Sequence, residues 1–272
     1  MSPRSPNLGS AVPTEAPFWA PPVLAVQFLT RLPVGSTASL SPEQVRDGLV
    51  RAVAWFPLIG TLIGGITAGV ALGSATVWHP IIAVILTLAV EVLVTGAFHE
   101  DAVADFADGF GGGQTGDDVR RIMKDSRIGT YGAVALIFAI GLRVALTIAL
   151  LATRPPVAAA VAIVAAATFG RWLIVVVMVT VPPAPAAAGL AKDIGAVGCS
   201  RLALASLAAL PATLGFGLEA PRAAVATLVA AIVFVVWFRR LLCCRIGGST
   251  GDCLGFAAYT GQLLLLLAAS AT

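Results

Sequence analysis

Residues 156–181 read PVAAAVAIVAAATFGRWLIVVVMVTV, a stretch of the chain in which the single charged residue is Arg171. About 20 consecutive apolar residues are enough for a helix to cross the hydrocarbon core of a bilayer. Similar runs recur along the 272 residues, whose mean hydropathy is +0.94 and of which only 11% are charged. These values lie outside the range of ordinary soluble domains. The sequence therefore predicts an all-α protein that crosses a membrane several times.

About seven apolar stretches are long enough to be transmembrane helices, and we expect them to form one integral-membrane helical bundle over residues 21–272. A further apolar piece, residues 18–29, is interrupted by Pro21 and Pro22, which favours an interfacial or re-entrant position. Residues 1–20 are rich in Pro, Ser and Ala and are expected to be a flexible cytoplasmic tail. The predicted spans are residues 52–78, 80–98, 131–153, 156–181, 202–218, 223–242 and 253–271.

The positions of Lys and Arg predict the orientation, because short loops rich in these residues stay in the cytoplasm. With seven spans, thirteen of the seventeen Lys and Arg residues fall on the side of the N-terminus. Arg154 and Arg222 fall on the other side, and Arg143 and Arg171 fall inside spans. We therefore expect a cytoplasmic N-terminus and a C-terminus outside. This topology accounts for most of the basic residues, so the net charge of +3 requires no nucleic-acid partner.

Seven of the fourteen acidic residues lie between Glu100 and Asp125. Among them Asp101, Asp105 and Asp108 are spaced i, i+4, i+7, so in a helix all three would project from one face. Three like charges on one face repel one another unless a cation neutralises them, and carboxylate oxygens suit Mg²⁺ or Mn²⁺. The alternative interpretation is a solvated acidic loop between two membrane helices.

Basic and glycine-rich segments accompany these carboxylates on the same predicted side. Lys124 and Arg127 beside a metal site would suit a phosphate or pyrophosphate. Arg245 precedes the glycine-rich residues 247–251, whose backbone amides could approach an anion closely. Asp252 could be another metal ligand, or it could cap the last span. Together the two segments predict phosphoryl or nucleotidyl transfer at the cytoplasmic membrane surface.

Three ionisable residues fall within the predicted spans: Glu91, Arg143 and Arg171. Such groups at membrane depth usually face a polar interior. Glu91 could extend the acidic site inward, or it could pair with one of the two arginines. Spacing along the chain does not decide between these alternatives.

Five motifs recur in the order seen in a known enzyme family. They are FLTRLP at 28–33, WFPLIG at 55–60, HED at 99–101 with the acidic run to Gly109, DSRIGTYG at 125–132 and GGSTGDCLG at 247–255. In these motifs the chain resembles the cobalamin synthase family, the adenosylcobinamide-GDP ribazoletransferases. The resemblance extends over residues 28–255, which is nearly the whole chain.

The resemblance implies a multi-pass enzyme of the bacterial inner membrane whose active site faces the cytoplasm. Its members transfer the cobinamide-phosphate moiety of adenosylcobinamide-GDP to α-ribazole or α-ribazole 5′-phosphate. The products are adenosylcobalamin, or its 5′-phosphate, and GMP, in the last assembly step of the nucleotide loop. The resemblance further implies Mg²⁺ as the cofactor, with Mn²⁺ as an alternative, and it leaves a homo-oligomer open.

The resemblance also implies roles for individual residues. The expected metal ligands are carboxylates, and basic groups and glycines are expected to hold the diphosphate, while His99 or Glu100 would take the proton of the attacking hydroxyl. The predicted metal ligands are Asp101, Asp105, Asp108, Asp125 and Asp252; the predicted catalytic residues are His99, Glu100, Lys124 and Arg127; the predicted substrate-binding residues are Arg31, Arg245 and Gly251.

Two other classes of protein compete with this interpretation. CDP-alcohol phosphotransferases also use aspartates and a divalent metal at a membrane surface, but their Asp-Gly-x-x-Ala-Arg element is absent around Asp101. A transporter could use Glu91, Arg143 and Arg171 to line a permeation path. Against transport, the acidic residues are concentrated in one segment and no inverted repeat is evident.

Overall fold

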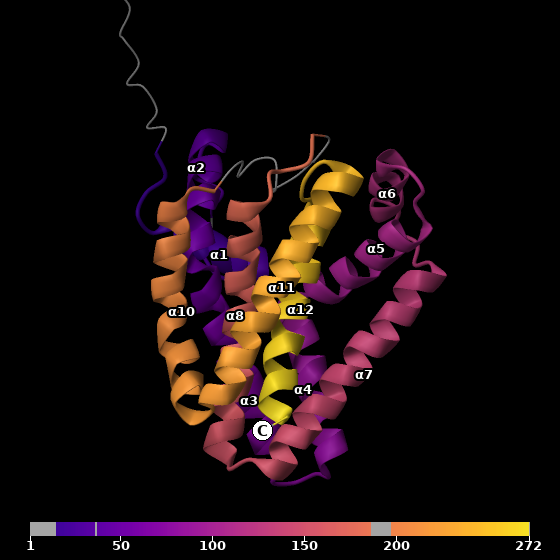
Figure 1. Ribbon diagram of the computed structural model, residues 1–272. Coiled ribbons are helices and arrows are strands. Elements are labelled where there is room, and N and C mark those ends of the chain that lie inside the picture. Colours follow the sequence, from indigo (N-terminus) through magenta and orange to yellow (C-terminus); the bar gives the residue numbers. More distant parts are fainter. Residues whose placement is uncertain (1–14, 36, 186–196, 272) are drawn as a thin grey trace, which may run out of the picture.

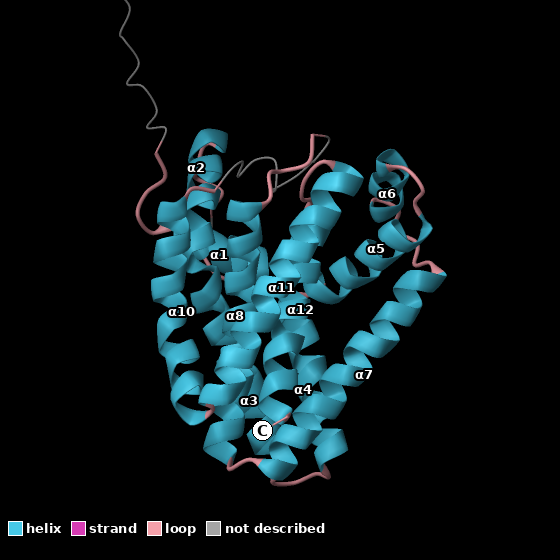
Figure 2. Cartoon of the chain, viewed as in Figure 1, coloured by secondary structure: helices cyan, strands magenta, loops and turns pink. Residues whose placement is uncertain are grey.

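A computed structural model describes residues 15–35, 37–185 and 197–271. Within these ranges the regular structure is helical, and the long helices pack side by side as a bundle (Figure 1). Figure 2 shows the same chain by secondary structure, with short loops joining the helices. The β-structure in the described ranges is limited to an isolated bridge between Pro183 and Ser249. The predicted all-α class is confirmed.

The helices follow the predicted apolar stretches closely. Their bounds are α1 Ala20–Leu29, α2 Pro42–Ala52, the 3₁₀ turn η1 Val53–Trp55, α3 Phe56–Ala75, α4 Pro80–Thr95, α5 Phe98–Gly112, α6 Gly116–Met123, α7 Thr130–Thr153, α8 Pro156–Thr180, α10 Cys199–Glu219, α11 Pro221–Ile246 and α12 Gly251–Ser270.

Six helical segments of the described chain are long and apolar enough to cross a membrane, and the number is seven if the bent pair α4 and α5 counts as one span. This agrees with the predicted polytopic bundle of about seven spans. The first span differs in one respect, because α2, η1 and α3 form one helical run from Pro42 to Ala75 that begins well before residue 52. Helix α1 has ten residues, too few to cross a bilayer.

Most of the predicted N-terminal tail, residues 1–14, lies outside the described residues. From Ala16 onward the chain is packed against the bundle. The amide of Ala16 donates to the carboxylate of Asp47 in α2 (2.9 Å), and both Ala16 and Ala20 are buried. Packing of the membrane domain therefore begins before residue 21.

Helix α8 is the most deeply buried of the candidate spans, and α3 packs closely along it. Two glycines of α3 make this approach possible. A Cβ atom on Gly60 would lie 2.6 Å from the carbonyl oxygen of Ala167, and one on Gly64 would lie 2.7 Å from Cα of Val164. The small-residue spacing in the sequence is thus a packing signal between membrane helices.

Replacing Gly60 with alanine should destabilise the bundle, because the added methyl group would push α3 away from α8. We expect a loss of about 1–3 kcal/mol, as for other overpacked cores. Gly65→Ala is the matched control, since a Cβ atom there has no neighbour within 4 Å. Thermal unfolding of the two variants in the same detergent measures the difference, and equal melting temperatures would contradict this packing role.

The predicted span 80–98 is broken near its end. Helix α4 stops at Thr95, α5 starts at Phe98, and the two axes differ by 88°. Between them Gly96 and Ala97 both have positive φ angles, 69° and 58°. Glycine adopts this conformation readily and alanine does so at a cost, so surrounding contacts must hold the bend. The carboxylates from Glu100 to Asp108 therefore lie on a helix nearly perpendicular to α4, and the alternative of an acidic loop is wrong for them.

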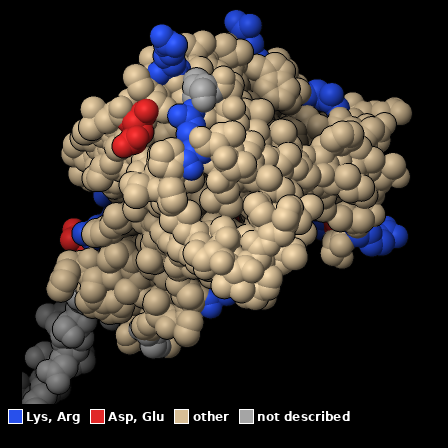
Figure 3. Space-filling model, turned by 90° about the horizontal axis from the view of Figure 1, so that it is seen from below, with Lys and Arg blue, Asp and Glu red and all other residues tan. Residues whose placement is uncertain are grey.

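The helix ends form two groups at opposite ends of the bundle. Helices α2 and α6 and the end of α11 lie at one end, while the α7–α8 connection and the C-terminus lie at the other (Figure 1). Seen from this second end, the surface is mostly uncharged, with a few scattered charged side chains (Figure 3). The acidic segment and the glycine-rich segment 247–251 are thus at the same end of the protein, as predicted.

Candidate active site at one end of the bundle

Helix α5 and the first turn of α12 place three aspartates within electrostatic range of Asp105. Asp105 of α5 is partly buried, and it experiences electrostatic repulsion from Asp101, Asp252 and Asp108. Asp101 is exposed, whereas Asp108 is buried. The predicted stripe on α5 is therefore helical, and Asp252, which is 147 positions from Asp105 in the sequence, joins it.

Backbone geometry at the start of α12 leaves the Asp252 side chain available. Thr250 is the N-cap, and its hydroxyl accepts a hydrogen bond from the amide of Cys253 (3.4 Å). Gly251 is the first residue of the helix and is exposed. Thr250, and not Asp252, therefore caps α12, so the capping interpretation of Asp252 is wrong.

The glycine-rich connection before α12 is anchored to the end of α8. The amide of Ser249 donates to the carbonyl of Pro182 (2.8 Å), and the amide of Ala184 donates to the carbonyl of Ser249 (3.0 Å). Gly247 and Gly248 have φ angles of 76° and 157°, which residues with a side chain rarely adopt. These glycines shape the turn that delivers Asp252 to α5.

Lys124 is a basic residue that interacts electrostatically with the candidate site. It is exposed at the C-terminal end of α6, and its charge acts favourably on Asp252. A long side chain with a mobile ammonium group can reach an anion bound at this end of the bundle. This placement agrees with the predicted contact to a diphosphate.

Asp125 and Arg127 are paired with each other. The Nε and Nη2 atoms of Arg127 donate to the two carboxylate oxygens of Asp125 at 3.0 and 2.7 Å. These hydrogen bonds, with a further one from the Arg127 amide, lower the pKa of Asp125 to about 2. Asp125 therefore stays ionised, and the structure joins it to Arg127 and not to Asp101, Asp105 or Asp252.

Arg245 and Arg31 make backbone contacts near the site. The guanidinium of Arg245 donates to the carbonyl of Gly113 (2.8 Å) and lies over the ring of Phe110 (5.9 Å). The amide of Arg31 donates to the carbonyl of Val94 (2.7 Å), and its side chain lies against Gly96. Arg245 thus ties α11 to the end of α5, and Arg31 supports the bend between α4 and α5.

Asp108 has a role that the sequence did not reveal. Its two carboxylate oxygens accept hydrogen bonds from the amides of Gly129 (2.7 Å) and Gly132 (2.8 Å) at the start of α7. No local pattern could have identified this cap, because the donors follow Asp108 by 21 and 24 positions. Each oxygen retains a second lone pair, so the predicted metal contact stays a prediction.

His99 and Glu100 point away from the stripe of aspartates. His99 is buried, and neither of its ring nitrogens has a hydrogen-bond partner among the described residues. Residues that are two positions apart in an α-helix point in directions about 200° apart. His99 therefore faces the side of α5 opposite to Asp101. Glu100 faces Arg143, whose Nη1 lies 3.9 Å from Glu100 Oε1. Their predicted role as proton acceptors stays a prediction.

Nearly the whole chain is similar to proteins of a known family. Residues 22–270 match the model of the family described as cobalamin-5-phosphate synthase. The chain belongs to this cobalamin-5-phosphate synthase family. An adenosylcobinamide-GDP ribazoletransferase of Ralstonia nicotianae is 42% identical over 246 residues, which is 89% of this chain and 92% of the relative. A protein of the same name from Sinorhizobium medicae is 40% identical over 255 residues, 92% of this chain and 95% of the relative. No solved structure matches the chain significantly.

The family assignment confirms the resemblance seen in the motifs. All the predicted site residues, from Arg31 to Asp252, lie within the matched region 22–270. The carboxylates of α5 and α12 thus lie within the cobalamin-5-phosphate synthase match, at the end where the glycine-rich motif also lies.

The four aspartates of α5 and α12 in this cobalamin-5-phosphate synthase family member offer the type of ligand that a hard divalent cation prefers. Within the described residues, no three His, Cys, Asp or Glu side chains are already drawn together as a metal site. The donors are nevertheless all oxygens, and Asp105 is partly buried among like charges. A bound cation would relieve that repulsion, and Mg²⁺ or Mn²⁺ is the natural choice for carboxylate ligands.

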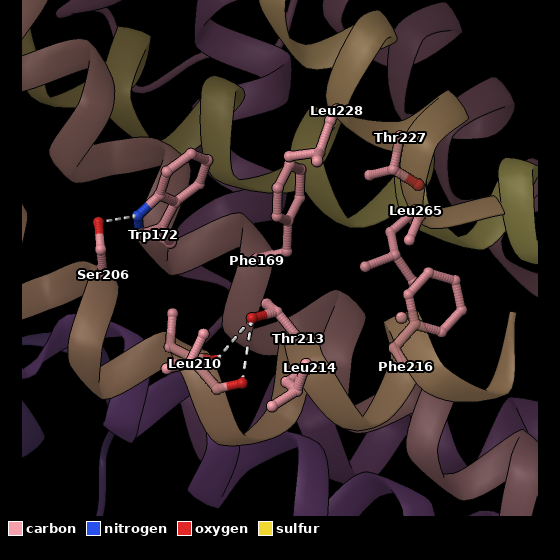
Figure 4. A pocket seen from close by; sticks show the side chains of 13 residues that line it. Phe169, Trp172, Ser206, Leu210, Thr213, Leu214, Phe216, Thr227, Leu228 and Leu265 are labelled. Carbon is pink, nitrogen blue, oxygen red and sulfur yellow. Dashed lines mark hydrogen bonds between the residues drawn. The ribbon is translucent and has the colours of Figure 1, made fainter. Parts of the chain in front are cut away.

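The family member also contains an apolar pocket that is separate from these residues. It has a volume of about 340 Å³ and lies between α8, α10, α11 and α12 (Figure 4). Two of its polar side chains bond to each other: Trp172 Nε1 donates to Ser206 Oγ (2.9 Å). Leu265 on its wall follows Asp252 by 13 positions of α12, or about 20 Å along the helix. None of the predicted site residues lines this pocket.

Proposed function

We propose that this protein transfers the cobinamide-phosphate moiety of adenosylcobinamide-GDP to α-ribazole or α-ribazole 5′-phosphate. GMP is released, and adenosylcobalamin or its 5′-phosphate is formed. The family membership, with relatives named adenosylcobinamide-GDP ribazoletransferase at 40–42% identity over about nine tenths of the chain, carries this proposal. The carboxylates and Lys124 at one end of the bundle supply the groups that such a transfer needs.

In this reaction a ribose hydroxyl of α-ribazole attacks the phosphorus bound to cobinamide. It is not the 5′-oxygen, because the 5′-phosphate of α-ribazole 5′-phosphate is retained in the product. The bond between that phosphorus and the oxygen bridging to GMP breaks, so the negative charge moves onto the departing GMP. The attacking hydroxyl loses its proton with either acceptor. The protein must therefore hold two phosphates close together, stabilise the leaving charge and accept a proton.

The carboxylates of α5 and α12 are the proposed metal ligands. Asp101, Asp105 and Asp252 are the best placed, because Asp101 and Asp252 both act on Asp105 and none is consumed by a cap. Mg²⁺ held there would neutralise phosphate charge and stabilise the leaving GMP. Asp108 lies on the same helix as Asp101 and Asp105, and it supports those two ligands while it holds the start of α7.

Basic side chains are proposed to bind the diphosphate around these ligands. Lys124 is exposed and free to turn towards it, and it is the first candidate. Arg127 can contribute if it exchanges Asp125 for a phosphate, since guanidinium groups bind both in the same bidentate manner. Arg245, which is bonded to Gly113, is proposed to shape the site from the side of α11.

The proposed location is the inner membrane of a bacterium, with the N-terminus and the active site on the cytoplasmic side. The long apolar helices support a multi-pass membrane protein. The excess of Lys and Arg on the side of the site supports a cytoplasmic orientation. The nucleotide substrate would then be available from the cytoplasm.

The purified protein in detergent or lipid nanodiscs should convert adenosylcobinamide-GDP and α-ribazole to equal amounts of cobalamin and GMP. We expect activity with Mg²⁺ and a loss of more than about 100-fold with EDTA, because the leaving charge would lack a counter-ion. Parallel reactions with α-ribazole 5′-phosphate identify the preferred acceptor. Folded protein that makes neither product would contradict the proposal, and assays with CDP-alcohol substrates and vesicle uptake would then test the two competing classes.

A further inference from the structure

Several ionisable and polar side chains are buried where α4, α5, α7, α8 and α12 meet, and the proposed reaction does not use them. Glu91 of α4 and Arg171 of α8 are 3% and 1% exposed, and Arg143 of α7 is 7% exposed. Tyr259 of α12 lies beneath the guanidinium of Arg143, whose Cζ is 5.6 Å from the ring centre. Buried ionisable groups within a membrane protein usually have a role that outweighs their desolvation.

Arg143 contacts both sides of the break between α4 and α5. Its Nη2 atom lies 2.5 Å from Oε2 of Glu91, one turn before the end of α4. Its Nη1 atom lies 3.9 Å from Oε1 of Glu100, in the first turn of α5. A planar guanidinium presents its donors in a fixed fork, so one side chain can set the relative placement of two carboxylates. The chain between those carboxylates contains the strained Ala97.

The same helix holds α5 at its other end. The amides of Gly129 and Gly132, at the start of α7, donate to Asp108 near the end of α5. The contact with Arg143 is made at the start of α5, through Glu100. Helix α5 is therefore attached to α7 at both ends, and Asp101 and Asp105 lie between the two attachments.

We propose that Arg143 is a positioning residue for the reaction. Its guanidinium clamps the two carboxylates across the 88° break and so directs α5, which places Asp101 and Asp105 opposite Asp252. Glu100 immediately precedes Asp101, so a shift of Glu100 moves that aspartate directly. The link to activity rests on the proposed function, whereas the clamp on the break does not.

A simple stabilising ion pair would not need this arrangement. Buried ion pairs are weak evidence for stability, because desolvation offsets most of their attraction. Here the pair Glu91–Arg143 is extended to a second carboxylate on the far side of a hinge. The contacts of Arg143 with both carboxylates therefore fix the direction of α5 relative to α4.

The clamp can be tested by a distance measurement that does not depend on turnover. Spin labels at Leu93 of α4 and Gly112 of α5, both exposed, span the break in a protein whose four native cysteines are replaced by alanine. The native arginine should give one narrow distance distribution, and Arg143→Gln should give a broader or shifted one. Arg154→Gln, at the other end of α7, is the matched control and should leave the distribution unchanged.

The activity test separates positioning from folding. Arg143→Gln should raise the Mg²⁺ concentration for half-maximal activity by about 10- to 100-fold, as is typical when groups that orient metal ligands are removed. Partial unfolding alone would lower the maximal rate and leave the Mg²⁺ requirement unchanged. Arg143→Lys keeps the positive charge but lacks the paired donors of a guanidinium. Its Mg²⁺ requirement should lie between those of the native protein and Arg143→Gln.

A second variant guards against a misfolded protein. Glu100→Gln leaves the Glu91–Arg143 pair in place and removes the charge on the α5 side alone, and it should also broaden the distance distribution. Native distances in both Arg143→Gln and Glu100→Gln would overturn the clamp. If the native protein proved inactive towards the proposed substrates, the proposed function would fail while the distance measurement still decided the role of Arg143.

Discussion

Replacing Asp105 with asparagine will lower turnover by more than about 100-fold, because it removes a charged oxygen from the proposed metal ligands. The same change should leave the protein at least as stable in the absence of Mg²⁺. Asp105 is repelled by Asp101, Asp252 and Asp108, so removing its charge relieves an unfavourable interaction. Activity and stability are thus expected to respond in opposite directions.

A turnover assay and a thermal unfolding experiment without Mg²⁺ measure these two effects. Asp117→Asn is a suitable control, since Asp117 is exposed and pairs with Arg120 on α6, away from the four carboxylates. We expect near-native turnover in the control. If Asp105→Asn retained native activity, Asp105 could not be a metal ligand; if it lowered both activity and stability, its role would be structural.

Replacing Asp108 with alanine should instead reduce both activity and stability. The change leaves the amides of Gly129 and Gly132 without their acceptor, and Gly132 is buried. An unsatisfied buried amide and a lost helix cap together suggest a loss of about 1–3 kcal/mol. Activity should fall as well, because α5 loses one of its two attachments to α7.

Thermal unfolding of Asp108→Ala with and without Mg²⁺ distinguishes a cap from a metal ligand. If Asp108 acts mainly as a cap, the variant melts at a lower temperature than the native protein in both conditions. A variant that matches the native protein without Mg²⁺, and that loses only the stabilisation by Mg²⁺, would identify Asp108 as a ligand instead. Asp108→Asn should be intermediate, since its amide retains one acceptor oxygen.

Much of the fold could be predicted from the sequence because membrane helices depend on long apolar runs, which are visible one segment at a time. The stripe on α5 was also predictable, since the i, i+4 spacing of Asp101 and Asp105 depends on helix geometry alone. The grouping of the acidic and glycine-rich segments at one end followed from the number of spans between them. Each of these inferences used local pattern or simple counting.

The break in the fourth span could not be predicted in the same way. Apolar residues continue through Gly96 and Ala97 to Phe98, so hydropathy shows no interruption. The positive φ angle of Ala97 depends on contacts from other helices and not on the residue itself. Gly96 offered a weak signal, because glycine is common where a helix ends in the left-handed conformation.

Partners across the fold were also beyond the reach of the sequence. Glu91 pairs with Arg143, which was one of the alternatives, but spacing gave no reason to choose Arg143 over Arg171. Asp125 and Arg127 were expected to serve a metal and a phosphate separately, yet they bind each other. Such choices depend on how helices pack, and packing is fixed only by the three-dimensional structure.

The joining of α5 to α12 also bears on how the protein is made. Asp105 emerges from the ribosome long before Asp252. The two meet only after α12 has entered the membrane and the connection before it has bonded, through Ser249, to Pro182 just after α8. A nascent or interrupted chain that stops before the insertion of α12 therefore contains the acidic helix without its counterpart. The carboxylates of α5 therefore gain their counterpart only after α12 has been made and inserted.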